Sequence, residues 1–254
     1  MVLFIATGAH PPRPRISTLW MSQVYSRDLW SAELRGIAEP DRSRPFTPRD
    51  ESTAKDRDMV KLGYKLMAEE HGPSALVRNT VRAEQAGFAF AAISDHFFPW
   101  LDEQGHAPFA WSVLGAAAQA TRQIELMTAV TCPIMRYHPA IIAQGAATMA
   151  VLSENRFILG LGAGERLNEH VVGEGWPGIG ERHERLSEAY DIIRGLLEGS
   201  MKNYRGKYFM LDDAKLYDRP DRAPAIVGAA GGGRPSRGAQ GRRNDHDRTA
   251  GRSH

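Results

Sequence analysis

The stretch Phe88-Ala89-Phe90-Ala91-Ala92-Ile93 runs directly into Ser94-Asp95-His96-Phe97-Phe98-Pro99-Trp100, so an apolar run ends abruptly in polar and aromatic side chains. The apolar part does not alternate strictly, which is typical of a parallel strand covered on both faces. Its polar end then lies at the rim of a parallel sheet. His96 changes charge near neutral pH, so it is the first candidate for acid–base chemistry. The alternative is that Asp95 caps a helix and His96 has only a structural role.

The composition argues against several classes of protein. Hydrophobic residues make up 42% of the 254 residues, which suffices for a packed core, and no apolar run is long enough to span a bilayer. The single cysteine, Cys132, excludes an intrachain disulfide and favours a reducing cytoplasm. Residues 59–227 carry 17 basic and 20 acidic side chains, so the net charge of +2 comes from the two ends. An acidic centre argues against a nucleic-acid-binding core.

The chain divides into three segments of different character. Residues 1–58 are rich in Pro, Arg, Ser and Asp and predict a poorly structured N-terminal extension. A natural start at Met59 is the alternative explanation of this segment. Residues 59–230 form the predicted domain. Residues 231–254 have hardly an apolar side chain, which predicts a disordered tail and is compatible with a shifted reading frame.

Strands and helices alternate within residues 59–230. Strands are predicted at 60–65, 88–93, 124–133, 156–162 and 224–230, helices at 73–87, 111–121, 139–152 and 181–197, and a hairpin at 203–211. Gly87 is expected just beyond the end of the first helix, and Pro139 at the first position of the third. This alternation predicts βαβ units and a parallel sheet, in an α/β fold of the TIM-like (β/α)8 barrel type that is truncated after about five strands.

Parallel strands place their carboxyl ends on one face, which carries the active site in barrel enzymes. That face is expected to collect Lys65, the segment 95–100, Val130 to Cys132, and the segment 162–168. A metal site is not expected there, because the first strand lacks the His-x-His pair with which barrel hydrolases usually open.

The segment Gly160-x-Gly162-x-Gly164-Glu165 is a poor dinucleotide fingerprint, because Glu stands where the third glycine belongs. We expect instead that these glycines let the backbone pass close to a flat cofactor. Glu165 and Asn168 would then hydrogen-bond to that cofactor. A simple turn with a solvated Glu165 is the alternative.

Four motifs, in unbroken order along the chain, indicate a family resemblance. They are Ser-Asp-His-Phe-Phe-Pro-Trp (94–100), Gly-His-Ala-Pro-Phe (105–109), Thr-Cys-Pro-Ile-Met-Arg-Tyr-His-Pro-Ala (131–140) and Leu-Gly-Leu-Gly-Ala-Gly-Glu-Arg-Leu-Asn-Glu (159–169). From about Lys61 to about Ala230, the chain resembles the luciferase-like monooxygenase superfamily. The most similar branch depends on the deazaflavin coenzyme F420 and is glucose-6-phosphate dehydrogenase-like.

The resemblance implies an oxidoreductase that transfers a hydride between an alcohol or sugar (phosphate) hydroxyl carbon and coenzyme F420. It implies that His96 takes the hydroxyl proton, that Trp100 helps to hold the reacting centre and that Glu165 protonates the reduced ring. The cofactor contacts implied by the resemblance are Asp95, Ala129, Val130, Cys132, Ala163, Gly164 and Asn168. It also implies a cis peptide bond between Ala129 and Val130. Cys132 and Ala163 stand where the glucose-6-phosphate enzymes have threonines, so the substrate stays open.

Two alternatives to this function remain. One is an FMN-dependent monooxygenase on the same fold, and the other is a truncated fragment without activity. The expected partners are a small-molecule substrate and, for an intact chain, a second copy in a homodimer. Neither nucleic acid nor a membrane is expected as a partner, and the expected location is the cytoplasm.

Overall fold

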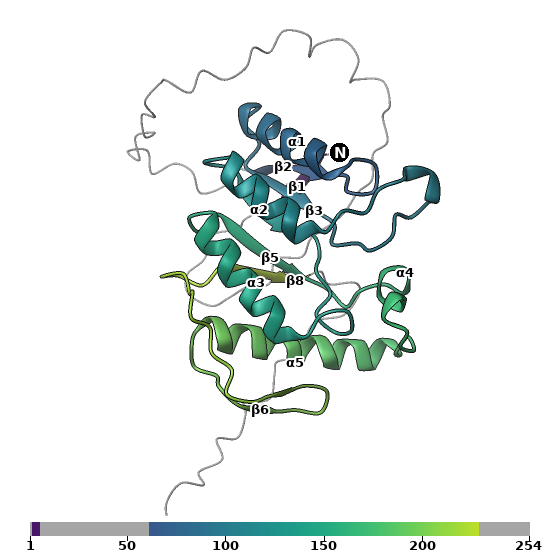
Figure 1. The fold of residues 1–254 in the computed structure, drawn as a ribbon, viewed down its shortest axis with the longest axis vertical. Coiled ribbons are helices and arrows are strands. Elements are labelled where there is room, and N and C mark those ends of the chain that lie inside the picture. Colours follow the sequence, from purple (N-terminus) through teal and green to yellow (C-terminus); the bar gives the residue numbers. More distant parts are fainter. Residues whose placement is uncertain (1, 6–60, 229–254) are drawn as a thin grey trace, which may run out of the picture.

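The computed structural model describes residues 2–5 and 61–228, and their centre is a six-stranded sheet (Figure 1). The strand order is β1-β2-β3-β4-β5-β8. The mutually parallel strands are β2 (Lys61–Leu66), β3 (Phe90–Ile93), β4 (Glu125–Thr128), β5 (Phe157–Leu161) and β8 (Ala225–Gly228). The strand β1 (Val2–Ile5) runs antiparallel along β2 at the edge of the sheet.

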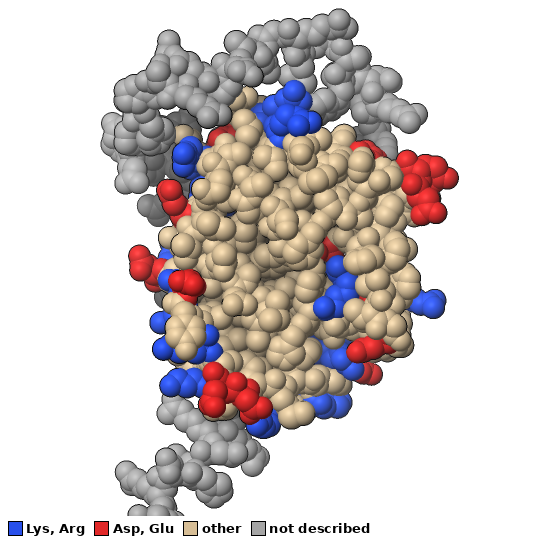
Figure 2. Space-filling view, in the orientation of Figure 1, with Lys and Arg blue, Asp and Glu red and all other residues tan. Residues whose placement is uncertain are grey.

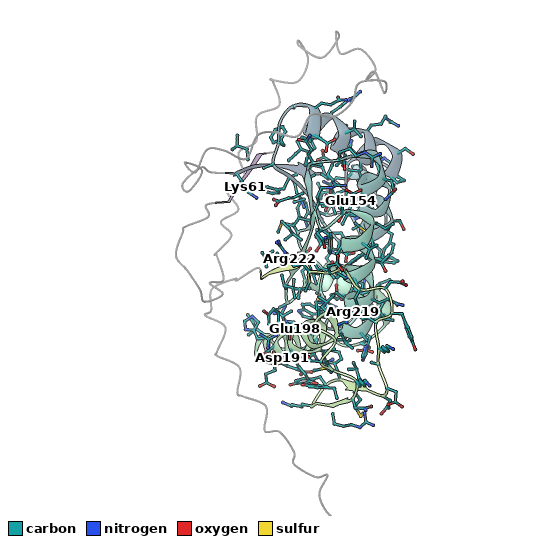
Figure 3. The ribbon with its side chains drawn as sticks, turned by 90° about the vertical axis from the view of Figure 1, so that its left-hand side faces the viewer. Lys61, Glu154, Asp191, Glu198, Arg219 and Arg222 are labelled. Atoms are coloured by element: carbon teal, nitrogen blue, oxygen red, sulfur yellow. The ribbon has the colours of Figure 1, made fainter. Side chains whose placement is uncertain are left out.

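Helices connect the parallel strands and lie on one side of the sheet, as the side view shows (Figure 3). They are α1 (Pro73–Gln85), α2 (Ala110–Ala120), α3 (Pro139–Leu152) and α5 (Ile179–Leu197). Shorter helical turns are η1 (Asp102–Gln104), α4 (Arg166–Glu169) and η2 (His170–Val172). The strands β6 (Tyr204–Arg205) and β7 (Met210–Leu211) form the predicted hairpin between α5 and β8.

The helix ends follow from local sequence. Pro73 and Pro139 lie in the first turns of α1 and α3, where a missing N–H costs no intrahelical hydrogen bond. Gly87 follows the C-cap of α1 with φ of +83°, a conformation that glycine adopts without steric cost. These ends fix the lengths of the connections and therefore where each strand begins.

The main core lies between the sheet and the helices. Its largest fully buried side chains include Leu66, Leu76, Leu114, Leu126 and Phe157. The buried faces of α2 and α3 are rich in alanine, which lets the two helices pack closely on the strands. A smaller cluster of Phe90, Ala92 and Met127 lies on the other face of the sheet. Every residue of β3 is buried, as its non-alternating apolar pattern predicted.

The structure differs from the sequence prediction in two places. The strand β1 lies in the N-terminal segment, where no strand was predicted. The rest of that segment and the predicted tail 231–254 lie outside the described residues. The strand predicted at 124–133 ends at Thr128, and beyond it Thr131 makes only an isolated parallel bridge with Leu161. A cis peptide bond joins Ala129 and Val130, as the resemblance implied.

Candidate active site

The predicted site residues follow three neighbouring strands, β3, β4 and β5. Because these strands are parallel, their carboxyl ends meet at one edge of the sheet. Figure 1 shows the long connection after β3 and the short helix α4 on the same side of the molecule. The structure therefore brings together segments that are up to about seventy residues apart in the chain, as the hydrogen bond between Phe97 and Asn168 illustrates.

His96 lies between two carboxylates at this edge. Its Nδ1 is 2.7 Å from Oε1 of Glu69, and its Nε2 is 3.4 Å from Oε1 of Glu165. The side chain of Glu69 is 0% exposed and that of Glu165 is 49% exposed, so the imidazole has an inner and an outer partner. Each ring nitrogen of His96 therefore faces a carboxylate, and the closer and more deeply buried of the two lies at Nδ1.

Glu69 comes from the connection after β2, which sequence reasoning did not single out. Burial alone would raise the pKa of Glu69, but the hydrogen bond with His96 and the neighbouring charges lower it. Lys65, at the end of β2, is also buried, and its Nζ donates to Oγ of Ser94. Burial lowers the pKa of Lys65 to about 8, and the charge of Glu69 opposes this shift. Glu69 could have been found in the sequence by its position, because it follows closely after the predicted rim residue Lys65.

Trp100 lies beside His96, as predicted. The two rings meet edge to face, with 5.5 Å between their centroids and 65° between their planes. Trp100 is exposed, as are Phe97 and Leu101 in the same segment after β3, and these three side chains are called the apolar rim. Such a rim can cover the flat or apolar part of a ligand.

Asn168 anchors the loop that carries His96. Its Oδ1 accepts hydrogen bonds from the backbone N–H groups of Phe97, at 2.8 Å, and Phe98, at 3.0 Å. Its Nδ2 donates to Oε1 of Glu165 at 2.9 Å. Both lone pairs of Oδ1 are therefore used, and one of the two N–H groups of the amide is bonded to Glu165.

Asp95 is turned into the protein. Its carboxylate accepts hydrogen bonds from Trp111 Nε1 at 3.1 Å, Thr131 Oγ1 at 2.8 Å and the hydroxyl of Tyr137 at 3.0 Å. Burial and the charge of Asp95 raise the pKa of Tyr137, which keeps its phenol protonated as a donor. The resemblance implied a cofactor contact for Asp95, whereas the side chain has its partners within the protein and is buried.

A buried ion pair lies next to Asp95. Arg136 Nε is 2.9 Å from Oε1 of Glu169, and the backbone N–H of Arg136 donates to Oε2 at 3.1 Å. Arg136 Nη2 also donates to the carbonyl oxygen of Asp95 at 2.6 Å. Burial alone would lower the pKa of Arg136, but Glu169 and Asp95 raise it. Sequence reasoning missed this pair, although both residues stand inside the quoted motifs.

The remaining predicted residues lie where β4 and β5 end. Ala129, Val130 and Ala163 are half-buried there, and Cys132 is buried as a free thiol whose pKa is raised by burial and by the charge of Glu169. Gly164 has φ of +69°, and a Cβ on it would lie 2.4 Å from Sγ of Cys132.

Gly160 lies against the neighbouring strand β4, which leaves no room for a side chain. A Cβ on it would lie 1.9 Å from the carbonyl oxygen of Thr128 in the neighbouring strand. The hydroxyl of Thr128 also bonds the backbone of Gly160, accepting from its N–H at 2.9 Å and donating to its carbonyl oxygen at 3.0 Å. Close packing of β4 on β5 therefore requires this glycine.

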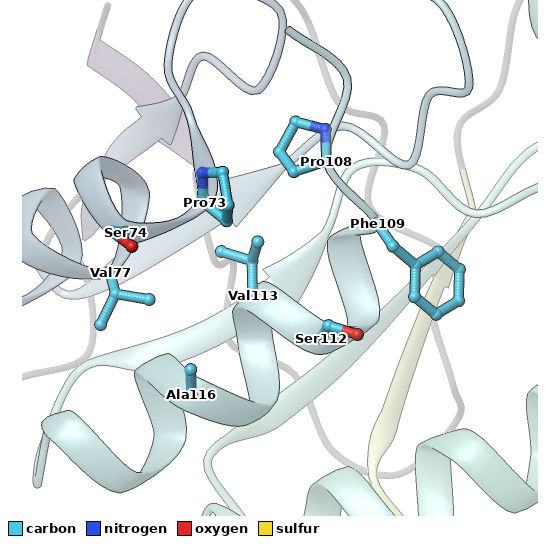
Figure 4. Close-up of a pocket in the computed structure, with 8 residues that line it drawn as sticks. All are labelled: Pro73, Ser74, Val77, Pro108, Phe109, Ser112, Val113 and Ala116. Carbon is cyan, nitrogen blue, oxygen red and sulfur yellow. The ribbon is translucent and has the colours of Figure 1, made fainter.

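A groove of about 410 Å³ lies elsewhere, between the beginnings of α1 and α2 (Figure 4). Its lining includes Pro73, Val77, Phe109 and Val113, and no group that titrates near neutral pH. None of the predicted site residues borders it, so it is not the site of the chemistry. Within residues 2–5 and 61–228 there is no cluster of three or more His, Cys, Asp or Glu side chains that could hold a metal ion. None of the helices in this described part is long and apolar enough to cross a membrane.

Comparisons with known proteins bear on the family and the fold of this chain. A family model described as luciferase-like monooxygenase matches residues 58–246. F420-dependent glucose-6-phosphate dehydrogenase from Amycolatopsis mediterranei is 47% identical over 175 residues, which are 68% of this chain and 53% of that protein. F420-dependent hydroxymycolic acid dehydrogenase from Mycobacterium tuberculosis is 44% identical over 171 residues, 67% of this chain and 48% of that protein. The chain thus spans about half the length of the curated relatives it matches.

A solved structure of a similar protein has the same fold over the matched part. An F420-dependent secondary alcohol dehydrogenase in complex with an F420–acetone adduct superimposes with a TM-score of 0.64 and 38% identity. The match covers 65% of this chain and 51% of that one. The predicted α/β fold of the TIM-barrel type is confirmed over the matched part.

Proposed function

The chain belongs to the luciferase-like monooxygenase family, and on this premise we propose that it is an F420-dependent oxidoreductase acting on a hydroxyl-bearing carbon. The observation that carries the proposal is the placement of His96 between buried Glu69 and half-exposed Glu165, at the carboxyl edge of a parallel sheet. The names of the relatives support it, since the three described above are F420-dependent dehydrogenases.

The residues at this edge fit a deazaflavin by their chemistry. When an alcohol is oxidised by hydride transfer, its hydroxyl proton must go to a base, and the reduced ring takes a proton from a separate acid. The Glu69–His96 pair offers a base at Nε2, because Nδ1 is directed at the buried carboxylate. Glu165 offers a second carboxyl group within reach of the same space.

Each of these side chains has a distinct task in the proposed reaction. Nε2 of His96 accepts the hydroxyl proton, while Nδ1 keeps its contact with Glu69. The charge of Glu69 stabilises the imidazolium that results. Bound F420 supplies the ring carbon that accepts the hydride. Trp100 packs against the imidazole and shields one side of it from water.

We assign the cofactor contacts to the small side chains at the ends of β4 and β5. They are Ala129, Val130, Cys132, Ala163 and Gly164, with the second N–H of Asn168 as a hydrogen-bond donor. Asp95 acts as a positioning residue, because it fixes the loop before His96 through Thr131 and Tyr137 rather than through a ligand.

A fluorescence titration with F420, beside one with FMN, tests the cofactor. Tighter binding of FMN would favour the monooxygenase alternative, and binding of neither would favour a fragment without activity. His96→Gln is expected to abolish turnover with little change in F420 affinity. His183→Gln, which alters an exposed histidine on α5, is the control and should change neither. An equal loss of affinity and turnover in His96→Gln would indicate a structural role instead.

The substrate class is a small molecule with a hydroxyl group. The relatives are named for glucose 6-phosphate, hydroxymycolic acid and a secondary alcohol, so a panel of these three types is the natural screen. The apolar rim of Phe97, Trp100 and Leu101 favours an alcohol with an apolar body. Faster turnover of the sugar phosphate than of every alcohol would contradict that preference.

We also propose that two copies associate through the face formed by α2 and α3. Neither helix contains a charged residue, and Figure 2 shows few Lys, Arg, Asp or Glu side chains in the centre of this face. Ile141, Val151 and Leu152 of α3 are exposed there, and burial by a second copy would stabilise a dimer. Light scattering should give the mass of two chains, and Ile141→Glu should reduce it to one. A monomeric protein, or a dimer that Ile141→Glu leaves intact, would contradict this interface.

A further inference from the structure

Arg136 joins three neighbouring segments of the site. It stands in the connection after β4, and its side chain is 7% exposed. Its Nη2 donates at 2.6 Å to the carbonyl oxygen of Asp95, in the segment after β3. Its Nε donates at 2.9 Å to Oε1 of Glu169, at the end of the helix α4 after β5. One buried guanidinium therefore connects the segments that follow β3, β4 and β5, which are adjacent in the sheet.

The bond to Asp95 holds the backbone on one side of His96. The carbonyl group that accepts it belongs to the peptide bond between Asp95 and His96. On the other side of His96, the next two backbone N–H groups donate to Oδ1 of Asn168. The backbone is thus held directly before and directly after the proposed base, by two side chains that come from different strand ends.

The short helix α4, which carries Asn168, is itself held by Arg136. It has four residues, and a single helical turn is not stable on its own. Its buried residues are Asn168 and Glu169. Both oxygens of Glu169 accept from Arg136, Oε1 from the side chain and Oε2 from the backbone N–H at 3.1 Å. This pair fixes α4 and therefore Asn168, which donates to Glu165 at 2.9 Å.

The two side-chain bonds of Arg136 suit a guanidinium and not an ammonium group. Nε and Nη2 belong to one rigid plane, so the positions of their two acceptors are fixed relative to each other. The guanidinium also lies over the ring of Tyr137, 4.9 Å from its centroid, and the hydroxyl of Tyr137 donates to Asp95. A lysine carries its charge on a single nitrogen at the end of a flexible chain, so it cannot hold Asp95 and Glu169 in the same geometry.

We propose that Arg136 is a positioning residue that sets the position of His96 relative to Glu165. One of its bonds fixes the peptide that enters His96, and the other fixes α4, whose Asn168 holds Glu165. The separation of 3.4 Å between Nε2 of His96 and Oε1 of Glu165 depends on both. The consequence for catalysis rests on the proposed function, whereas the arrangement of the two side chains does not.

Hydrogen exchange of backbone amides, followed by NMR without a cofactor, tests this arrangement. Arg136→Lys keeps the charge but loses one bond, so the N–H groups of Phe97 and Phe98 should exchange about tenfold faster. Arg194→Lys is the matched control, because Arg194 and Glu198 form an exposed pair on α5, and it should leave these rates unchanged. A merely structural role would speed exchange in β3, which requires unfolding of the whole fold, and leave the loop unchanged. That result overturns the proposal.

Glu169→Gln covers the case in which Arg136→Lys does not fold. Glutamine has the same shape, but its NH2 group replaces one of the two oxygens that accept from Arg136. The helix α4 should then be held less firmly, and the N–H groups of Phe97 and Phe98 should again exchange faster. Wild-type rates for these two groups in folded Glu169→Gln also contradict the proposal.

Turnover with F420 and a secondary alcohol tests the consequence for catalysis. A displacement of about 1 Å can cost about 100-fold in rate, so kcat of Arg136→Lys should fall about 10- to 100-fold. The affinity for F420, measured by fluorescence, should change less, and Arg194→Lys should keep the wild-type kcat. A wild-type kcat in Arg136→Lys refutes the positioning role. Absence of turnover in the wild type counts against the proposed function, and the exchange rates then still decide whether Arg136 holds the two segments.

Discussion

Replacing Arg136 with methionine removes one half of the buried ion pair that joins three loops of the site. The side chains of Arg136 and Glu169 are 7% and 1% exposed, so neither charge is well solvated. Arg136→Met deletes the contact of Nε with Glu169 at 2.9 Å and the bond from Nη2 to the carbonyl of Asp95 at 2.6 Å. The methionine stem keeps part of the packing. Removing one partner of a buried pair costs about 3–5 kcal/mol, and we expect a loss of this size.

Urea unfolding at neutral pH measures this loss against a matched control. Arg185 has the same contact, with Nε donating to Oε1 of Glu181 at 2.9 Å, but its side chain is 24% exposed and that of Glu181 is 41% exposed. Exposed pairs contribute little because water and salt screen them, so Arg185→Met should cost less than about 1 kcal/mol. Equal losses for Arg136→Met and Arg185→Met would refute the argument from burial.

A second substitution separates charge from packing. Arg136→Met combined with Glu169→Gln removes the uncompensated carboxylate, so the double variant should be more stable than Arg136→Met alone. A double variant that is equally or less stable would show that the loss comes from packing or from the bond to Asp95.

Other substitutions address burial, backbone space and loop anchoring. Because the pKa of Lys65 falls from 10.5 to about 8 on folding, the unfolded chain binds more protons between these pH values. The wild type should therefore gain about 3 kcal/mol relative to Lys65→Met as pH rises through this window, and parallel pH profiles would contradict it. Gly160→Ala places a Cβ against the backbone of Thr128 and should cost at least about 2 kcal/mol in melting experiments. Gly115→Ala, in open space on α2, should gain up to about 1 kcal/mol, and similar melting of the two variants would count against the steric argument. Asn168→Ala leaves two loop N–H groups without their acceptor and should cost about 1–3 kcal/mol, with faster amide exchange in that loop. Unchanged exchange would show that the amide does not anchor the loop.

Much of the fold could be predicted because it depends on local patterns. The parallel strands β2, β3, β4, β5 and β8 are recognisable in the sequence as short apolar runs. Gly87 and Pro139 mark helix ends through their backbone preferences alone. The strand β1 could not be predicted in this way. Its four residues stand in a segment without periodicity, and its partner β2 is more than fifty residues away. The strand at 124–133 was predicted too long because apolar character continues past Thr128, where pairing stops.

The site residues could be predicted where the residue type itself indicates the chemistry. His96, Trp100, Glu165 and Asn168 were all expected at the rim, and the structure places each in contact with another of the four. Their roles in binding and catalysis stay predictions. Glu69, Arg136 and Glu169 were missed because acidic and basic residues in the connections between strands are usually solvated. Only the folded arrangement shows that these three are buried.

The contacts divide the site into a fixed inner side and an adjustable outer side. Glu69 is enclosed, and Asp95, the residue before His96, is tied to Thr131 and Tyr137, so these contacts fix His96 relative to the sheet. Glu165 accepts a hydrogen bond from the buried amide of Asn168, and about half of its side chain is exposed to solvent. A charge in that position is screened by water and responds to whatever covers it. The position of His96 is thus set by buried contacts within the described part of the chain, whereas the surroundings of Glu165 change with whatever covers it.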